Sequence, residues 1–558
     1  MFLFLRKAAL LLLALVLLTS ALFVSCDQPE ENPLITVEIT SAADMAKIGI
    51  ENTHPLNATY LLMNDITLEN WLPIGDSALP FSGVFDGKGK TITLISFNTG
   101  AISAMPHIGI FAFVKGKSAQ SKAVIKNYYI NSSVNVESTS TSNGHSVGLA
   151  AGAAEMAEID NITLSGTFSF SCARTIYAGG IAGYISGETI VKNCSSSLSM
   201  NIIPGTGGQP VTAQANMYPS FLAYSYAGGF AGLFKDGAGI VNCHNTGNVI
   251  ADNTLCDVSG QVFTGGISGG SVYTMSTRYH GYITDSSSAG NITGKAKGSW
   301  TFAGGIAGTI AGNDTKIERC FAEGTISSAG TGSGWPYVGG IVGYNYYGAL
   351  VSQCFFTGTV VNDKGIDYTG GIAGYNSRFS SANSRIEDCW SGGTVQGFNN
   401  AGGIVGQNQI EALVRRCYST AEVLISGNAG AGGGGSGDSA LGGIGGIIGM
   451  SASLLDNAIT SCVALNPSIT ANSGDNIHRV IGRKGNANAG MSNNHAWSGI
   501  TIETDGTYTE DIGADKLDGA NIDTQKPPQS FYESLGWNFT NVWTIGTDGY
   551  PKLRWSQQ

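Results

Sequence analysis

Apolar residues along most of this chain occur in short stretches rather than in helical periods. Pairs such as Thr325-Ile326 and Thr359-Val360 stand between turns rich in glycine, serine and asparagine, and no segment sustains a 3.6-residue apolar repeat. β-Branched residues bounded by such turns are typical of short strands. The exception is an almost uninterrupted apolar run over residues 8–24. The pattern therefore predicts an all-β protein behind an N-terminal apolar segment.

The glycines mark an internal repeat. A Gly-Gly-x-x-Gly core occurs eight times, and successive cores begin 49, 37, 39, 35, 31, 32 and 43 residues apart. A recurring period of this size indicates stacked structural units. The paired glycines are Gly179 and Gly180 (closed by Gly183), Gly228 and Gly229, Gly265 and Gly266, Gly304 and Gly305, Gly339 and Gly340, Gly370 and Gly371, Gly402 and Gly403, and Gly445 and Gly446.

In seven of the eight units a second block follows (a β-branched residue, two polar positions and a cysteine), with the cysteine 15 to 19 residues after the first glycine of the core. In one unit Ser286 takes the place of the cysteine. A small residue and a strand-like pair usually follow, so each unit offers about three short strands. The cysteines of this block are Cys194, Cys243, Cys320, Cys354, Cys389, Cys417 and Cys462.

Units this short cannot bury an apolar face alone, whereas stacked units can. We therefore predict a right-handed parallel β-helix of about ten coils over residues 101–500. Residues 37–100 would cap its N-terminal end, and the aromatic-rich residues 501–558 would cap the other, because open strand edges invite aggregation. A β-propeller is the alternative, although its blades carry four strands.

The repeated cores and their cysteine blocks resemble the GLUG-motif repeat family of bacterial surface proteins. The resemblance covers about residues 109–465, and residues 60–92 look like the module that precedes such repeats. It implies a secreted or surface-attached β-solenoid, often adhesin-like and sometimes appended to secreted enzymes. It implies no particular ligand.

The repeated residues have structural explanations. Glycine lets a neighbouring coil approach closely and lets the chain turn through positive φ. The seven cysteines, at one repeat position, are expected to form a buried stack of unpaired thiols, because parallel side chains about 4.8 Å apart do not converge as a disulfide requires. Zinc ligation is the alternative, but it needs four converging ligands. The states of Cys172 and Cys256 are left open.

Asparagine also recurs, six residues after the first glycine of three consecutive cores, at Asn345, Asn376 and Asn408. Stacked asparagines at one repeat position predict an amide ladder.

The N-terminus resembles that of an exported lipoprotein. Arg6 and Lys7 precede the apolar run, which ends in Leu-Phe-Val-Ser-Cys at Cys26. This ending resembles a bacterial lipobox, which implies a signal peptide over residues 1–25 and acylation of Cys26. An acidic tether would follow at residues 26–36. Two or more acyl chains make a stable membrane anchor. The acidic residues just after Cys26 resemble surface-export signals, so we expect an outer-membrane, cell-surface location, with retention in the inner leaflet through Asp27 as the competing interpretation. A plain signal peptide or an uncleaved anchor helix are the alternatives.

The amino-acid composition limits the classes of molecule that this chain could bind. The 558 residues carry a net charge of −11 and only 12% charged residues, which argues against nucleic acid, since phosphate binding needs a basic surface. The seven histidines form no metal-spaced pair, and we expect no metal, no cofactor and no catalytic residue. Four carboxylates lie in or beside the cysteine blocks, and a polysaccharide-active β-helix enzyme (a lyase or glycoside hydrolase) remains an alternative: Asp285, Glu318, Glu387 and Asp388.

Aromatic residues between the motifs are the candidates for ligand contact. Large amphipathic rings can stack on sugars or proteins, although they can equally be core. We therefore predict an adhesin-like binding scaffold for glycan or protein ligands, with a passive spacer as a further alternative. The candidates, which we place in turns, are Trp300, Trp335, Tyr337, Tyr346 and Tyr347.

Overall fold

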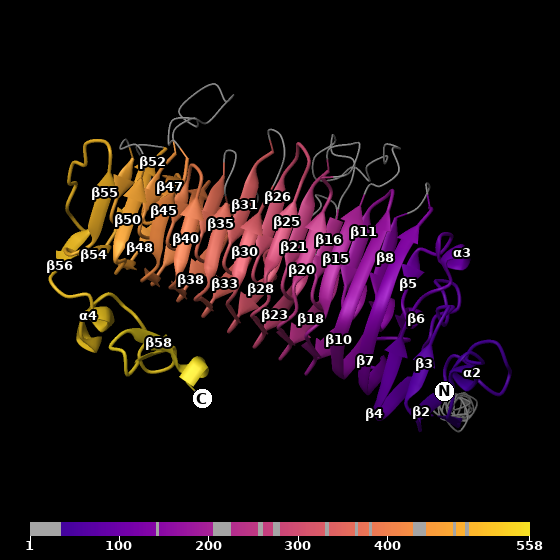
Figure 1. Cartoon of the computed structure of the whole chain (residues 1–558). Helices are drawn as coiled ribbons and strands as arrows, with labels where there is room; N and C mark the ends of the chain where they lie inside the picture. The colour runs from indigo at the N-terminus through magenta and orange to yellow at the C-terminus, as the bar shows by residue number, and fades with distance from the viewer. Residues whose placement is uncertain are drawn as a thin grey trace, which may run out of the picture.

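The computed structural model describes residues 35–140, 144–204, 225–254, 260–271, 280–329, 334–362, 367–378, 382–427, 442–471, 476–485 and 490–557. They form a rod of stacked coils in which nearly every strand pairs in parallel with its equivalent in the next coil (Figure 1). The predicted parallel β-helix is therefore confirmed. Cys26 and Cys256 lie outside the described residues.

One coil shows how each unit is built. It contains β31 (Pro336–Gly339), β32 (Val342–Tyr346), β33 (Leu350–Ser352), β34 (Phe355–Phe356) and β35 (Thr359–Asn362). β31 belongs to an 11-stranded sheet, here called the first short sheet, and β32 to a second short sheet, also 11-stranded. The last three strands are consecutive pieces of one long sheet. A coil thus has five strand segments on three sheets, where the sequence suggested about three strands.

The number of coils follows from the short sheets. Within the described residues the first short sheet runs from β5 (His107–Ile108) to β51 (Ile477–His478), and the second from β6 (Phe111–Lys115) to β52 (Ile481–Lys484). Eleven stacked strands in each agree with the expected ten or so coils. The aliphatic side chains between the three sheets, such as Ile341 and Val351, are fully buried and form one continuous core.

The core glycines are required because they lack a Cβ. A Cβ on Gly340 would overlap the carbonyl oxygen of Gly371 in the next coil and the ring of Phe356 across the interior. A Cβ on Gly343 would come within 2.6 Å of the carbonyl oxygen of Gly308. None of the glycines in the eight cores has a positive φ, so our expectation of a turn through positive φ is wrong. Close packing of backbone on backbone is the physical reason for the motif.

The left-handed conformation occurs instead just before each cysteine. There a non-glycine residue turns the long sheet between two of its pieces, and asparagine or aspartate often takes this position because their side chains tolerate it best. Side chains of neighbouring coils pair along this bend, as when Asn242 Nδ2 donates to Asn193 Oδ1 at 2.8 Å. The residues are Asn193, Asn242, Asp285, Arg319, Gln353, Asp388, Arg416 and Ser461.

The seven repeat cysteines lie behind that bend, and all are buried and unpaired. Cys354 shows the pattern: its Sγ faces the carbonyl oxygen of Ser352 at 3.1 Å and that of Ile317, in the preceding coil, at 3.7 Å. Ser286 fills the same place with an Oγ–H that donates to the Thr284 carbonyl oxygen at 2.8 Å. Off the column, Cys172 is also buried and unpaired.

The predicted amide ladder is present inside the rod. Asn345 Nδ2 donates to Asn376 Oδ1 at 2.9 Å, and Asn376 Nδ2 donates to Asn408 Oδ1 at 2.8 Å. All three side chains are fully buried, and the ladder satisfies both polar groups of Asn376, whereas Asn345 Oδ1 at the end of the ladder finds no partner among the described residues.

The N-terminal residues extend the stack. β1 (Thr36–Ile39), β2 (Thr59–Leu62) and β4 (Val84–Leu94) pair in parallel and continue into β7 (Ala123–Ser138) of the long sheet. The expected capping module, residues 37–100, thus contributes strands to the same sheet as the repeats. Two short helices lie at this end, α2 (Ala42–Met45) and α3 (Thr99–Ile102).

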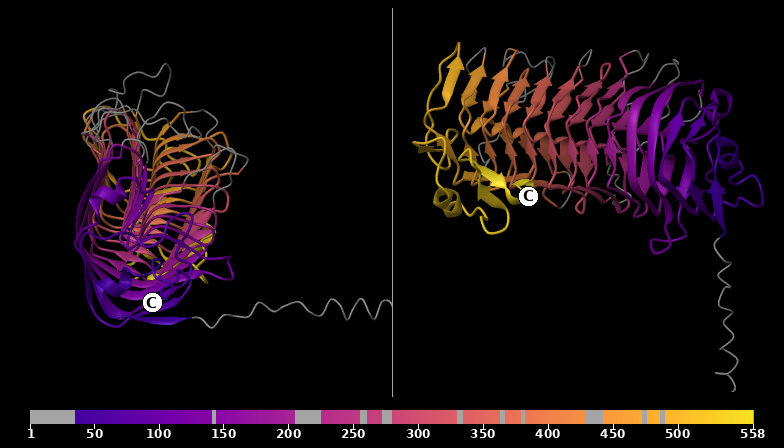
Figure 2. Two further views of the ribbon diagram at one scale, coloured as in Figure 1. Left: turned by 90° about the vertical axis from the view of Figure 1, so that its right-hand side faces the viewer. Right: turned by 60° about the horizontal axis from the view of Figure 1, so that its bottom comes forward.

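The C-terminal residues divide into two parts. Residues 505–519 close the end of the rod, where the backbone N–H groups of Val480 and Ile481 both donate to the carbonyl oxygen of Leu517. Beyond β56 (Ala520–Ile522), residues 523–557 turn back beside the rod (Figures 1 and 2). This C-terminal strap contains α4 (Gln529–Ser534), β57 (Trp543–Ile545), β58 (Pro551–Leu553) and a 3₁₀ turn (Arg554–Gln557).

The last coil has no glycine pair, and this difference explains why the other coils need one. By register, His478 and Arg479 take the places of Gly445 and Gly446. No further coil follows, so a side chain fits there, and the backbone N–H of Arg479 donates to Asp518 of the closing segment at 2.8 Å.

Candidate ligand-binding face

Six aromatic rings stack along the rod on the first short sheet. Each stands two positions before the first glycine of its core, and strand register pairs it with the next. Successive ring centroids are 5.3, 4.3, 4.5, 4.9 and 5.2 Å apart. They form a cluster separate from the main aliphatic core, so they point outward. The rings are Tyr177, Tyr226, Phe263, Phe302, Tyr337 and Tyr368.

A second row of rings crosses this column at one coil. The ring of Tyr337, on β31, stacks on that of Tyr344, on β32, with centroids 5.5 Å apart. Tyr344 stacks on Tyr346 at 4.5 Å, and Tyr346 contacts Tyr347 at 4.8 Å. Because β31 and β32 meet at the glycine core, the row runs across both short sheets.

Two tryptophans extend the row. Trp300 and Trp335 precede equivalent strands of neighbouring coils and stack with centroids 6.0 Å apart and ring planes 13° apart. Trp300 also meets Tyr337 edge-on at 6.3 Å. We call this row the aromatic face: Trp300, Trp335, Tyr337, Tyr344, Tyr346 and Tyr347.

The structure thus brings all five predicted aromatics together, but not all in turns. Tyr337 and Tyr346 lie within strands and are only 6% and 2% exposed, which corrects their expected placement. Trp335 is 38% exposed, and Trp300 and Tyr347 are half-buried. The buried tyrosines therefore support the rings that reach the surface.

Sequence reasoning did not identify the longitudinal column of rings on the first short sheet. The signal for the column was present: an aromatic residue stands two positions before the first glycine in six successive cores. Strand periodicity places that position on the face opposite the inward residue between them, which for Tyr337 is Val338.

The polar character of this surface comes from phenol groups. Burial, with a smaller effect of the neighbouring Asp367 carboxylate, raises the pKa of Tyr368 to about 12. Its hydroxyl therefore remains a neutral hydrogen-bond donor at physiological pH. Flat rings with hydroxyl donors at their edges match sugars, which present C–H faces and hydroxyl rims.

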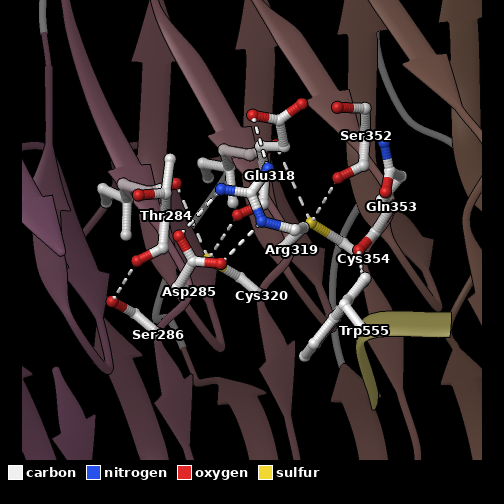
Figure 3. A network of polar contacts seen from close by, with 12 residues as sticks. Thr284, Asp285, Ser286, Glu318, Arg319, Cys320, Ser352, Gln353, Cys354 and Trp555 are labelled. Atoms are coloured by element: carbon white, nitrogen blue, oxygen red, sulfur yellow. Dashed lines mark hydrogen bonds and ion pairs between the residues drawn. The ribbon is translucent and has the colours of Figure 1, made fainter. Parts of the chain in front are cut away.

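The carboxylates considered for catalysis lie elsewhere, on the outside of the long sheet, and are paired with cations. Asp285 accepts bonds from Arg319 Nε at 2.6 Å and Nη2 at 2.8 Å (Figure 3). Glu318 lies 3.1 Å from Arg319 Nη1 and 2.9 Å from Lys316 Nζ. The hydrogen bonds from Arg319 lower the pKa of Asp285.

The second pair of carboxylates is held in the same way. Arg416 donates to both oxygens of Asp388 at 2.8 Å and lies 3.3 Å from Glu387. Trp543 of the C-terminal strap donates to Asp388 at 3.2 Å. A glycosidase acid needs a carboxyl group with a raised pKa beside a second carboxylate in an open cleft. The pairs of Arg319 with Asp285 and of Arg416 with Glu387 and Asp388 join neighbouring coils, whereas Glu318 pairs with cations of its own coil.

Two features are absent from the described residues. No group of three or more His, Cys, Asp or Glu side chains in that part of the chain is arranged to hold a metal ion. No helix there has the length and apolarity to span a membrane.

Comparisons with known proteins give one family and one solved structure. A model of the GLUG motif matches residues 336–361, which is the coil that carries most of the aromatic face. A search of curated proteins finds no match. A crystal structure of a "putative immunoglobulin A1 protease" from Bacteroides ovatus aligns over 93% of this chain and 92% of its own, with 14% identity and a TM-score of 0.25. That similarity is too low to carry an argument about activity. The chain therefore carries a GLUG motif at residues 336–361, and the Gly-Gly-x-x-Gly core within that motif recurs through the stack.

Proposed function

We propose that this chain is a lipid-anchored cell-surface solenoid that binds a glycan on its aromatic face. The observation that carries the proposal is the continuous row of rings from Trp335 to Tyr347, with one tryptophan 38% exposed. Trp335, Trp300 and Tyr347 reach the surface and can each stack on a sugar ring, and the buried tyrosines between them hold these rings in one row. Aromatic anchors also dominate protein interfaces, so a protein ligand is the other outcome that the experiment must separate.

The proposed anchor is Cys26, acylated after removal of residues 1–25. Acylation there would leave nine residues between the lipid and Ile35, where the described fold begins. The test is metabolic labelling with palmitate. The wild-type chain should be labelled and a Cys26→Ala variant should not; equal labelling of both would overturn the anchor.

A binding role is favoured over catalysis by the state of the carboxylates. Asp285, Glu318, Glu387 and Asp388 are all held by arginine or lysine side chains. A passive spacer would need no surface rings.

The binding test is a screen of immobilised glycans and host matrix proteins, with the matrix proteins presented intact and deglycosylated. The screen compares the wild-type chain with Trp300→Ala/Trp335→Ala. Tyr129→Ala is the matched control, because Tyr129 is 51% exposed but lies on the long sheet. Glycan binding that the double substitution abolishes and the control retains supports the proposal. Binding that survives deglycosylation indicates a protein ligand, and binding that the double substitution leaves unchanged overturns the assigned face.

A further inference from the structure

Exposed apolar side chains gather at the N-terminal end of the rod. Of the eleven large hydrophobic residues that are exposed in the described part of the chain, six fall between residues 35 and 95. Ile50, at 81%, Leu79, at 66%, and Leu72, at 55%, are the most exposed of all eleven. The six are Ile35, Ile50, Met63, Leu72, Leu79 and Ile95. Single exposed apolar residues need no explanation, but a local concentration indicates an interaction surface.

The three most exposed residues surround one cavity. Ile50, Leu72 and Leu79 line a pocket of about 560 Å³ between the α2 segment and the loop after β3 (Ile66–Leu68). Ile48 and Trp71 also line it and are nearly buried, at 3% and 6% exposure. We call this surface the N-terminal apolar face: Ile48, Ile50, Trp71, Leu72 and Leu79.

The position of the face in the chain indicates what covers it. If Cys26 is acylated, only nine residues separate the lipid from Ile35, and a chain of that length spans at most about 30 Å. α2 follows β1 directly in the chain, and Figure 1 shows α2 beside β2 and β3 at the end of the rod where the described residues begin. The bilayer that holds the acyl chains would therefore lie within about 30 Å of Ile35, at the end of the rod that carries this face. This step rests on the proposed anchor.

The charges beside the face indicate the kind of lipid. Glu69 and Asp76 line the pocket, and Glu51 follows Ile50. The nearby cation, Lys47, forms an ion pair with Asp44 at 3.2 Å. A surface with this excess of carboxylates is repelled by anionic headgroups, so a zwitterionic lipid surface fits it best.

We propose that the N-terminal apolar face docks on the zwitterionic bilayer surface that holds the Cys26 acyl chains. Ile50, Leu72 and Leu79 enter the boundary between headgroups and acyl chains, and the pocket between them receives the end of an acyl chain. Docking fixes this end of the rod at the membrane, so the aromatic face is held at a defined distance above it.

The test measures the depth of single residues in the acylated full-length chain, reconstituted in phosphatidylcholine vesicles. Ile50→Cys carries a fluorescent label, in a Cys256→Ser background that removes the one cysteine after Cys26 outside the described residues. Leu454→Cys is the matched control, because Leu454 is also exposed, at 53%, but follows β47 (Ile448–Ala452) near the other end of the rod. Nitroxide groups on the lipid chains should quench the label at residue 50 and spare the label at residue 454. Equal quenching at the two positions overturns the docking.

A second variant tests the face itself. Leu72→Ser/Leu79→Ser in the Ile50→Cys chain removes two apolar contacts without touching the buried core, and should lower the docked population roughly tenfold or more. Vesicles with anionic lipid should lower it too. Unchanged quenching in the double variant overturns the assigned face. Palmitate labelling is read separately, so a chain that is labelled but not quenched contradicts docking alone, whereas an unlabelled chain contradicts the anchor on which docking rests.

Discussion

Trp555 donates a hydrogen bond from Nε1 to the carbonyl oxygen of Gln353 at 3.0 Å, across 202 positions of the chain. The contact lies at the end of the C-terminal strap, whose aromatic side chains cover a row of rings on the long sheet. Phe355, Trp390 and Tyr418 form that row, with centroids 5.0 and 5.6 Å apart. The strap therefore protects the side of the rod, while the segment before it closes the end.

Loss of Trp543 should detach this strap. The side chain is fully buried, packs against Trp537 at 4.7 Å and donates to Asp388. Trp543→Ala should cost about 3–5 kcal/mol of the free energy that holds the strap in place. Urea titration followed by tryptophan fluorescence measures it, with the exposed Trp335→Ala as control. Equal midpoints for the two variants would show that the strap contributes little.

The glycine cores should not tolerate alanine. In Gly371→Ala the Cβ would overlap the carbonyl oxygen of Gly403, which is backbone and cannot move aside, so we expect a loss of about 3 kcal/mol or more. Gly100→Ala is the control: the nearest atom is Asn98 Oδ1 at 3.5 Å, and alanine suits α3. Thermal unfolding compares them. Similar stability of the two variants would contradict the backbone-contact explanation.

The seven repeat cysteines should not react with thiol reagents while the protein is folded. All seven thiols are buried and therefore out of reach of reagents in the folded chain, and burial also raises the pKa of the Cys389 thiol. Mass spectrometry after maleimide treatment should find the seven repeat cysteines unmodified until the chain is unfolded in urea. An Ile50→Cys variant provides the exposed reference. Repeat cysteines that react as fast as this reference would place the column at the surface.

The closing segment should weaken in acid. Burial acts to raise the pKa of Asp518, but hydrogen bonds from His478 and from the backbone N–H groups of Asp511 and Arg479 outweigh it and lower the pKa below 3.8. A lowered folded-state pKa stabilises the fold above pH 3.8, and this contribution is lost as pH falls through the folded value. Hydrogen exchange of the Val480 and Ile481 amides should therefore increase below pH 4. In Asp518→Asn the exchange should be fast already at pH 7; a wild-type rate there would contradict this role.

The repeat could be predicted because the same contact recurs in every coil. Gly340 and Cys354 face the equivalent residues of neighbouring coils. The same packing requirement therefore selects the same residue type at that position in many repeats. The strap could not be predicted in the same way. The contact of Trp543 with Asp388 occurs once, between residues 155 positions apart, so no repeating pattern in the sequence indicates it.

The aromatic face could be predicted only in part. Trp300, Trp335 and Tyr337 were predicted from the sequence as candidate ligand contacts. Tyr337 was placed in a turn, however, because insertions of variable length hide where each strand begins. The register of Gly339 with Gly370 fixes that boundary and places Tyr337 inside β31. The outward side of the strand then follows from simple alternation.

The most direct measurement of the central claim is oxidative footprinting of the chain with and without the glycan that the screen identifies. Hydroxyl radicals modify exposed aromatic rings, and a bound ligand protects those it covers. Trp335, Trp300 and Tyr347 should be protected together, while Tyr129 on the long sheet should be modified equally in both samples. Protection at Tyr129, or none at Trp335, would contradict a ligand lying across the aromatic face.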